Sequence, residues 1–548
     1  MNWLTRRSSI LLLILFIALF LRAYKIGNNP PGLTPDEASL GYNAYSILKT
    51  GRDEYGTLLP IIFKSFGDYK PGLYVYLTVP SVAILGLNET SVRLPSVISG
   101  VISIYLIYLI VEKLFKNEKL ALISLIVAAT NPWLIYFSRG AWEVNVALTL
   151  TLAGIYFFFK SFEKQKLIIL AVLFFALTLV DYQGAKLSTG IVLFILFILY
   201  WKDVLKLKFK YLTSAFIVGL IVSLPIVFSL FNGQGGRLTV FSVFSYPRPT
   251  EYLQSFLNEG NVQKGSITYD LFYNEPLNFF RGIAGRFFNH FSVRFLFFEG
   301  DWANPRHTPP YQGVLVIGDS IFLVIGAIAF LRQKISRPIL FVWLCLLLAT
   351  LPSILSRDQV HAVRSFNLAI PLIILIAFGI NYLLSNSKKI YIVALLLIYA
   401  ATYFYFLDSY FVHQPIHNSQ YWQYGYKQMV EKITPIQKNY PKVIVEQSYD
   451  QPYIYFLFYQ KYDPVKWQKQ AYLKQDSGLD VGHVEKLDNI CFCAIDWSRD
   501  RGDHKDLIVA DIKVIPPLDS NDPKQFTLID EIKYLNGKDT GWRILEIK

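Results

Sequence analysis

Long runs of apolar residues, separated by short polar stretches, dominate the first three quarters of the chain. A helix needs about 20 such residues to cross the hydrocarbon core of a bilayer. Eleven segments reach or approach this length: residues 8–26, 92–112, 119–138, 144–160, 166–181, 187–201, 211–231, 312–331, 337–355, 366–384 and 390–408. The pattern predicts a mainly α-helical, multi-pass membrane protein with about 11 transmembrane helices.

One further apolar stretch, residues 72–87, is shorter and contains Pro80. We interpret it as a helix lying at the outer membrane interface, because the basic loops then alternate correctly. Lysine and arginine collect in five short loops, at residues 113–119, 160–166, 202–210, 332–337 and 388–389. Such loops face the cytoplasm. The sequence therefore predicts a plasma-membrane protein with a cytoplasmic N-terminus.

Three large segments then lie outside the cytoplasm: a first loop (27–91), a long loop (232–311) and the chain from 409 onward. In the last segment the apolar runs shorten to strand length, as at 442–446 and 507–510, around a helical stretch near 451–460. This pattern predicts a membrane domain, residues 1–408, followed by a small extracytoplasmic α/β domain, residues 409–548. Cys491 and Cys493 stand too close for an easy mutual disulfide.

Composition supports this class of protein. Hydrophobic residues make up 53% of the chain and charged residues only 17%, against about 25% in soluble domains. The 3 cysteines and the apolar majority exclude disordered and disulfide-framework proteins. The formal charge is +13, but no basic and aromatic motif accompanies it. We expect the basic residues to contact membrane lipid headgroups and expect no nucleic-acid binding.

The first outer loop contains an acidic pair at a predicted helix start. Thr34 is a candidate N-cap, Pro35 suits the first helical position, and Asp36 and Glu37 follow. Gly51 ends the helix. Acidic residues in a first helical turn favour the helix dipole whatever the function, so this local pattern alone leaves a structural and a catalytic role open.

Other ionisable residues gather at the same predicted face. They occur in four short segments that also contain polar and aromatic residues: 68–72, 138–145, 181–186 and 357–364. Arg139 and Glu143 are four residues apart, the spacing of a helical ion pair. The predicted cytoplasmic loops carry mainly lysine, whereas these outer segments also carry Asp, Glu, His, Arg and Trp. This asymmetry points to a functional site at the outer face.

An ordered set of motifs carries a family resemblance: Pro35-Asp36-Glu37-Ala38, Asp68-Tyr69-Lys70-Pro71, Arg93-Leu94-Pro95-Ser96 and Ser138-Arg139 followed by Glu143. The set resembles the dolichyl-phosphate-mannose protein mannosyltransferases and their bacterial relatives, including the aminoarabinose transferases that modify lipid A. Such proteins are membrane glycosyltransferases of the GT-C fold with a lipid-phosphate sugar donor. The resemblance covers about residues 1–200, with a weaker match at His361 and Arg364. The paired prolines of the family stand here as Pro71-Gly72.

The resemblance implies roles for several residues. Asp36 looks like the general base, and Glu37 its neighbour that contacts the acceptor or orients the loop. Glu143 occupies the place of a second acidic residue, and Lys70 resembles the cation that meets the donor phosphate. Further candidates for the phosphate are the cations Lys186, His361 and Arg364. Candidates for other substrate contacts are Asp68, Tyr69, Arg139 and Tyr182.

The expected donor is a polyprenyl-phosphate sugar, and the acceptor a hydroxyl on a protein, a lipid or a glycan. No cofactor is required by the motifs. A divalent metal remains open, since His290 and His307 share the long loop with Glu299 and Asp301, although without a recognisable ligand spacing. The alternative hypothesis is a lipid or sugar transporter or flippase. That class is built from repeated halves with broken helices meeting at mid-membrane, whereas here the charged residues gather at one face.

Overall fold

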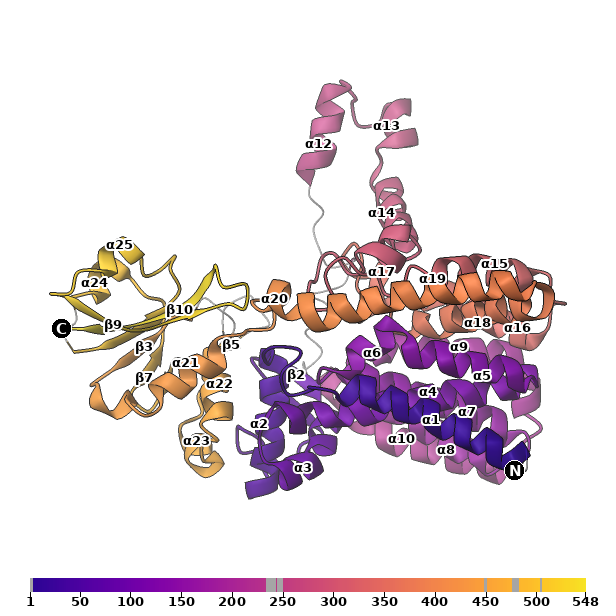
Figure 1. Cartoon of the computed structure of the whole chain (residues 1–548), viewed down its shortest axis with the longest axis horizontal. Coiled ribbons are helices and arrows are strands. Elements are labelled where there is room, and N and C mark those ends of the chain that lie inside the picture. The colour runs from indigo at the N-terminus through magenta and orange to yellow at the C-terminus, as the bar shows by residue number, and fades with distance from the viewer. Residues whose placement is uncertain (1–2, 233–242, 244–249, 448–450, 476–481, 503–504) are drawn as a thin grey trace.

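The computed structural model describes residues 3–232, 243, 250–447, 451–475, 482–502 and 505–548. The apolar helices lie side by side in an elongated bundle, and the C-terminal sheet lies beyond one end of it (Figure 1). The bundle helices are α1 (Trp3–Ala23), α4 (Glu89–Phe115), α5 (Glu118–Thr130), α6 (Pro132–Ser138), α7 (Glu143–Ser161), α8 (Leu167–Leu179), α9 (Ala185–Val204), α10 (Phe209–Phe231), α15 (Asp319–Leu331), α16 (Arg337–Leu348), α17 (Leu351–Ile354), α18 (Ala369–Asn386) and α19 (Lys389–Asp408).

Each of the eleven predicted spans coincides with helix in the structure. Among the described residues, 7 helices are long and apolar enough to cross a membrane, or 8 with the pair α5 and α6, which is bent by 54° at Asn131. The other three predicted spans are the shorter apolar helices α1, α8 and α15. The mainly helical, multi-pass fold is therefore confirmed, with shorter helices at these three positions.

The two ends of the bundle differ in chemistry. At one end, ion pairs join Lys113 to Glu163 and Arg337 to Asp203. These contacts bring together four of the lysine-rich loops. The acidic, aromatic and histidine-containing segments meet at the opposite end, beside the C-terminal sheet (Figure 1). The structure thus separates the two groups of loops as the charge pattern predicts, and the direction of the bundle across the membrane stays a prediction.

The first loop folds into α2 (Pro35–Thr50), a hairpin of β1 (Ile62–Ser65) and β2 (Asp68–Pro71), and α3 (Leu73–Leu85). Local signals set α2 as predicted: the side chains of Thr34 and Glu37 form a capping box, and Gly51 ends the helix in the left-handed conformation at φ 69°. Helix α3 has 13 residues and covers about 20 Å, too little to cross the bilayer core.

In the long loop, residues 233–242 and 244–249 lie outside the described part of the chain. The loop then forms α12 (Thr250–Glu259), α13 (Ile267–Phe272) and α14 (Glu275–His290), which project away from the bundle (Figure 1). A single π-helical turn, η1 (Arg294–Phe298), returns the chain to the bundle. Its buried Phe295 packs against Trp133 at the start of α6, with ring centroids 5.7 Å apart.

The C-terminal region is an α/β domain, as predicted. Its six-stranded sheet has the order β6-β7-β3-β8-β10-β9, with β3 parallel to both neighbours and the outer pairs antiparallel. The strands are β3 (Val443–Val445), β6 (Lys486–Leu487), β7 (Ile490–Phe492), β8 (Leu507–Ala510), β9 (Phe526–Lys533) and β10 (Thr540–Ile547). The expectation for Cys491 and Cys493 was wrong: the two cysteines form a disulfide at the end of β7.

The C-terminal domain packs on the first loop. Helix α22 (Pro452–Tyr459) lies against α2, and the Tyr455 hydroxyl donates to the Leu33 carbonyl at 3.0 Å. Between them Glu54 is fully buried, and its carboxyl accepts from the Asn43 amide (3.0 Å) and the Tyr453 hydroxyl (3.3 Å). Burial raises the pKa of Glu54 to about 8, so the carboxyl is mainly neutral at neutral pH.

We expect Glu54→Gln to reduce the loss of stability between pH 5 and pH 8. The unfolded carboxyl ionises near pH 4.5, whereas the folded one holds its proton to about pH 8. The native state therefore binds more protons in this window, and its stability falls as the pH rises. A neutral Gln removes this loss, which at about 1.4 kcal/mol per pH unit over roughly three units amounts to about 3–4 kcal/mol at pH 8. Thermal unfolding at pH 5 and pH 8 measures the change in stability, and the control is Glu431→Gln at an exposed position. An equal loss of stability with pH in wild type and Glu54→Gln would contradict the prediction.

Candidate functional site

A cavity of about 670 Å³ lies between the first loop and the bundle. Its lining residues fall within six segments far apart in the sequence: residues 34–37, 70, 141–144, 182–187, 306–307 and 352–364. All seven residues predicted as catalytic or phosphate-binding line this one cavity: Asp36, Glu37, Lys70, Glu143, Lys186, His361 and Arg364. Tyr182 lines it as well. The fold thus gathers the candidate chemistry of the outer segments into one place.

Asp36 and Lys70, both from the first loop, form an ion pair at the cavity. Asp36 stands in the first turn of α2, where its side chain is 53% exposed, and Lys70 reaches it from β2 as an ion pair. The hairpin holds Lys70 in register with Phe63, so the lysine position is set by backbone pairing. An exposed carboxylate beside a cation can accept a proton from a bound hydroxyl.

Glu37 has a different environment from its neighbour. Its buried carboxylate accepts hydrogen bonds from the Arg93 Nε (2.9 Å) and Nη2 (3.2 Å), the Ala141 N–H (2.8 Å) and the Thr34 N–H (3.0 Å). Arg93 is fully buried and also donates to the carbonyls of Ile26 and Pro30. Of the two roles implied by the resemblance, these contacts favour orienting the loop.

Glu143 begins α7 and faces the cavity, with Asp181 buried close by. Burial, and then the negative charge of Glu143, hold the pKa of Asp181 well above its usual range. Of these two acids, Glu143 is the one that lines the cavity.

Three cations line the cavity away from Lys70. Lys186 stands in the first turn of α9, Arg306 in the long loop, and Arg364 before α18. Arg364 also pairs with Asp358 at 2.6 Å. Such a set of donors suits a phosphate, which accepts charge-assisted hydrogen bonds through several oxygens.

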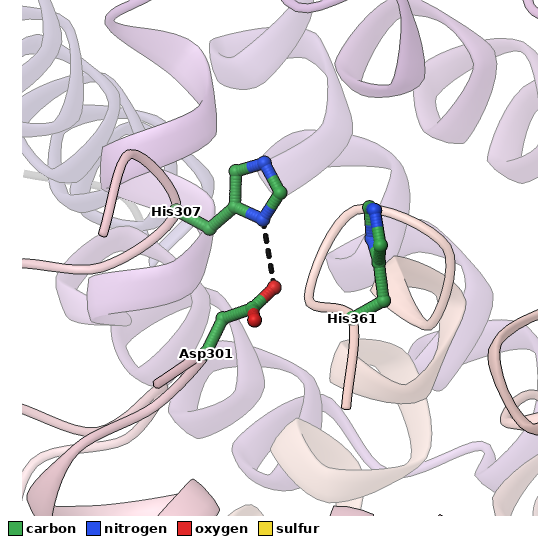
Figure 2. Close-up of side chains that lie close together, drawn as sticks. All are labelled: Asp301, His307 and His361. Atoms are coloured by element: carbon green, nitrogen blue, oxygen red, sulfur yellow. Dashed lines mark hydrogen bonds and ion pairs between the residues drawn. The ribbon is translucent and has the colours of Figure 1, made fainter. Parts of the chain in front are cut away.

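Two histidines complete this side of the cavity. His307 is buried and its Nδ1 lies 2.7 Å from a carboxylate oxygen of Asp301, and His361 lies opposite them (Figure 2). Partial burial, followed by the charge of Arg364, holds the pKa of His361 well below its usual range. The His307 ring also packs against Trp142, with centroids 5.4 Å apart.

Three predicted substrate contacts lie elsewhere. Asp68 and Tyr69 stand on β2 beside Lys70, where the Gln183 amide donates to the Asp68 carboxylate (3.3 Å) and to the Tyr69 carbonyl. Arg139 lies outside the cavity lining: it is fully buried, and its guanidinium donates to the Tyr410 hydroxyl and to four carbonyls at and after the end of α1. Helix ends leave such carbonyls without partners and attract cations, so Arg139 points toward α1 and away from Glu143.

Sequence reasoning missed two groups in the site. Arg306 precedes His307 in the long loop and lines the cavity, and its place beside a histidine was the available signal. Arg93 was quoted only as part of a motif, although a charged residue in an apolar helix usually has a buried partner. Here that partner is Glu37.

Comparison with known proteins gives a family match over part of the chain. Residues 69–228 match the family model described as dolichyl-phosphate-mannose-protein mannosyltransferase. An uncharacterized protein of Aquifex aeolicus (strain VF5) is 27% identical over 203 residues, which make up 36% of this chain and 40% of that protein. The match thus spans less than half of that relative.

Solved structures of ArnT from Cupriavidus metallidurans are similar over the whole chain. The structure bound to undecaprenyl phosphate is 11% identical, with a TM-score of 0.53 over 99% of this chain and 98% of that one. The apo structure is 12% identical, with a TM-score of 0.53 over 99% and 97%. The chain therefore shares the GT-C fold of these ArnT structures, and its residues 69–228 match the family model of the dolichyl-phosphate-mannose-protein mannosyltransferases.

Proposed function

We propose that this protein transfers a sugar from a polyprenyl-phosphate donor to an acceptor hydroxyl. The observation that carries the proposal is the cavity itself. It combines an exposed carboxylate, Asp36, with the cations Lys186, Arg306 and Arg364 at one end of an apolar helix bundle. A polyprenyl tail can stay in the lipid while its phosphate enters such a cavity. The similarity to ArnT, solved with undecaprenyl phosphate, supports this donor class.

The reaction requires a base and a stabilised leaving group. Asp36 takes the proton of the acceptor hydroxyl while the hydroxyl oxygen attacks the anomeric carbon. The bond between that carbon and the phosphate oxygen breaks, and the phosphate leaves with the electron pair. A single displacement of this kind inverts the anomeric carbon. Glu143 lies in the same cavity and would orient the acceptor or the sugar.

The cations act on the leaving group. Negative charge accumulates on the departing phosphate, and fixed cations stabilise it there. Lys186, Arg306 and Arg364 line the cavity and would fill this role, with His361 as a further hydrogen-bonding group. Lys70 contacts Asp36 in the free protein and would turn toward the phosphate when the donor binds.

The charge pattern supports an orientation. With the lysine-rich end of the bundle in the cytoplasm, the cavity and the C-terminal domain lie outside the plasma membrane, and the N-terminus lies inside. The acceptor is then a hydroxyl of an exported protein, a lipid headgroup or a cell-envelope glycan. Helix α3 would rest at the outer interface.

A transfer assay tests the function. Purified protein in sealed lipid vesicles is supplied with radiolabelled polyprenyl-phosphate sugars and with crude envelope acceptors. We expect label to move from lipid to acceptor for one sugar of the panel, with inversion of the anomeric carbon. Retention would reject the single displacement. Label that stays on the lipid throughout, or crosses the bilayer without transfer, would reject the glycosyltransferase and favour a flippase.

Lys186→Met is expected to weaken donor binding about tenfold to a hundredfold, since a hydrogen bond to a charged group contributes about 1.5–3 kcal/mol. The measurement is the binding of labelled undecaprenyl phosphate to purified protein in detergent. The matched control is Lys202→Met, which removes an exposed lysine from the other end of the same helix, α9. Equal affinities for the two variants would remove Lys186 from the phosphate site.

A further inference from the structure

The cluster Asp301, His307 and His361 has the chemistry of a metal site. Each side chain offers one ligand atom, and these atoms all lie within 4.8 Å of one another. Figure 2 shows the three side chains turned toward a common space, with His361 coming from a segment more than fifty positions away in the chain. Two imidazoles and one carboxylate are a usual protein ligand set for zinc.

Contacts around the cluster hold the ligands in place. The carboxylate of Asp301 accepts the Ala362 N–H at 2.7 Å and the Asn304 side-chain amide at 2.9 Å. The His361 backbone N–H lies 3.4 Å from Nε2 of His290. Hydrogen bonds of this kind orient metal ligands and raise affinity. The other two long-loop candidates stand outside the set. His290 contacts the backbone of His361 through Nε2, and Glu299 pairs with Arg294.

We propose that Asp301, His307 and His361 bind one Zn²⁺ ion at the wall of the cavity. Zinc bonds of about 2.0–2.1 Å bring ligand atoms to roughly 3.4 Å from one another, so a small rotation of the side chains closes the set. His307 and His361 line the cavity while Asp301 is buried behind them. Three protein ligands leave a fourth position on a tetrahedral ion for a further ligand.

The nitrogen ligands favour zinc over magnesium, which prefers oxygen ligands and keeps its water. Arg306 and Arg364 stand nearby and repel a cation, but Arg364 is paired with Asp358, which offsets part of that repulsion. If the proposed function holds, a donor phosphate oxygen would take the fourth position, and the ion would add to the stabilisation of the leaving group.

Zinc content tests the site without any substrate. Full-length protein without a polyhistidine tag is stripped with a chelator, dialysed against Zn²⁺ and washed, and its metal is measured by mass spectrometry. We expect about one zinc per chain for wild type. His361→Ala and His307→Gln should each lose nearly all of it. The control is His413→Ala, an exposed histidine paired with Asp408, which should keep the ion.

Wild-type protein without zinc, or variants that retain it, would overturn the site and leave His307 and Asp301 as a hydrogen-bonded pair. X-ray absorption gives a second measurement that does not depend on how well a variant folds: wild type should show nitrogen and oxygen neighbours at about 2.0–2.1 Å, and sulfur neighbours would contradict the assignment. Because neither readout uses the donor, zinc binding without sugar transfer would reject only the proposed function. Full transfer by zinc-free protein would reject only the contribution of the ion to the reaction.

Discussion

Asp36→Asn is expected to lower sugar transfer by about 10²–10⁴-fold, the usual contribution of a general base. The amide keeps the shape of the side chain but cannot take the proton of the acceptor hydroxyl. The first turn of α2 should persist, because its capping box uses Thr34 and Glu37. Donor binding should persist as well, since the variant frees Lys70 from its ion pair. The measurement pairs a transfer assay with donor binding on the same preparation.

The control for Asp36→Asn is Asp408→Asn, the same change at an exposed residue at the end of α19. This variant should transfer sugar at the wild-type rate. Full activity of Asp36→Asn would remove Asp36 from the role of base. Loss of donor binding together with transfer would instead assign Asp36 to the binding site. A transporter would keep its activity in both variants, so the comparison also separates the two classes of protein.

Breaking the ion pair between Glu37 and Arg93 is expected to have the largest effect on stability. Both side chains are buried, at 4% and 0% exposure. Removal of one partner leaves a buried charge without compensation, which costs about 3–5 kcal/mol. Glu37→Gln and Arg93→Met should therefore each lower the thermal midpoint strongly. The double variant should lose less than the sum of the two, because neither charge is then left alone.

The same variants separate positioning from acceptor contact. Glu37 links α2 to Ala141, which stands just before Glu143 in the cavity wall. If Glu37 positions the loop, Glu37→Gln should lower kcat with little change in KM for the acceptor; a higher KM with unchanged kcat would indicate acceptor contact. Lys432→Met is the control, since it breaks a more exposed pair with Asp530, at 60% and 29% exposure, within the C-terminal region. That change should cost less than about 1 kcal/mol.

The C-terminal domain contacts the first loop and does not line the cavity in the part of the chain that the structure describes. Among the described residues, none from 409 onward lines the cavity, whereas Tyr455 and Tyr453 contact the first loop that carries Asp36. The domain therefore acts on α2 from the side opposite the cavity, and we expect its contribution to activity to pass through the position of that helix.

The sequence by itself determined the positions of the helices along the chain. Apolar runs predicted every helix of the bundle, and Thr34, Pro35 and Gly51 marked both ends of α2. These features follow from hydrogen bonds and burial among near neighbours, which a local pattern records. The same pattern placed the acidic, basic and histidine-containing segments at one end of the bundle.

Only the tertiary structure decided which of these side chains meet. Arg139 and Glu143 have the spacing of a helical ion pair, yet Arg139 turns to the carbonyls at the end of α1. Glu37 is buried in an ion pair with Arg93, while the side chain of its neighbour Asp36 stays exposed. His361 joins Asp301 and His307 from another segment. Such contacts depend on how helices and loops pack across long separations in sequence, and a buried polar group takes whichever partner the packing brings within reach.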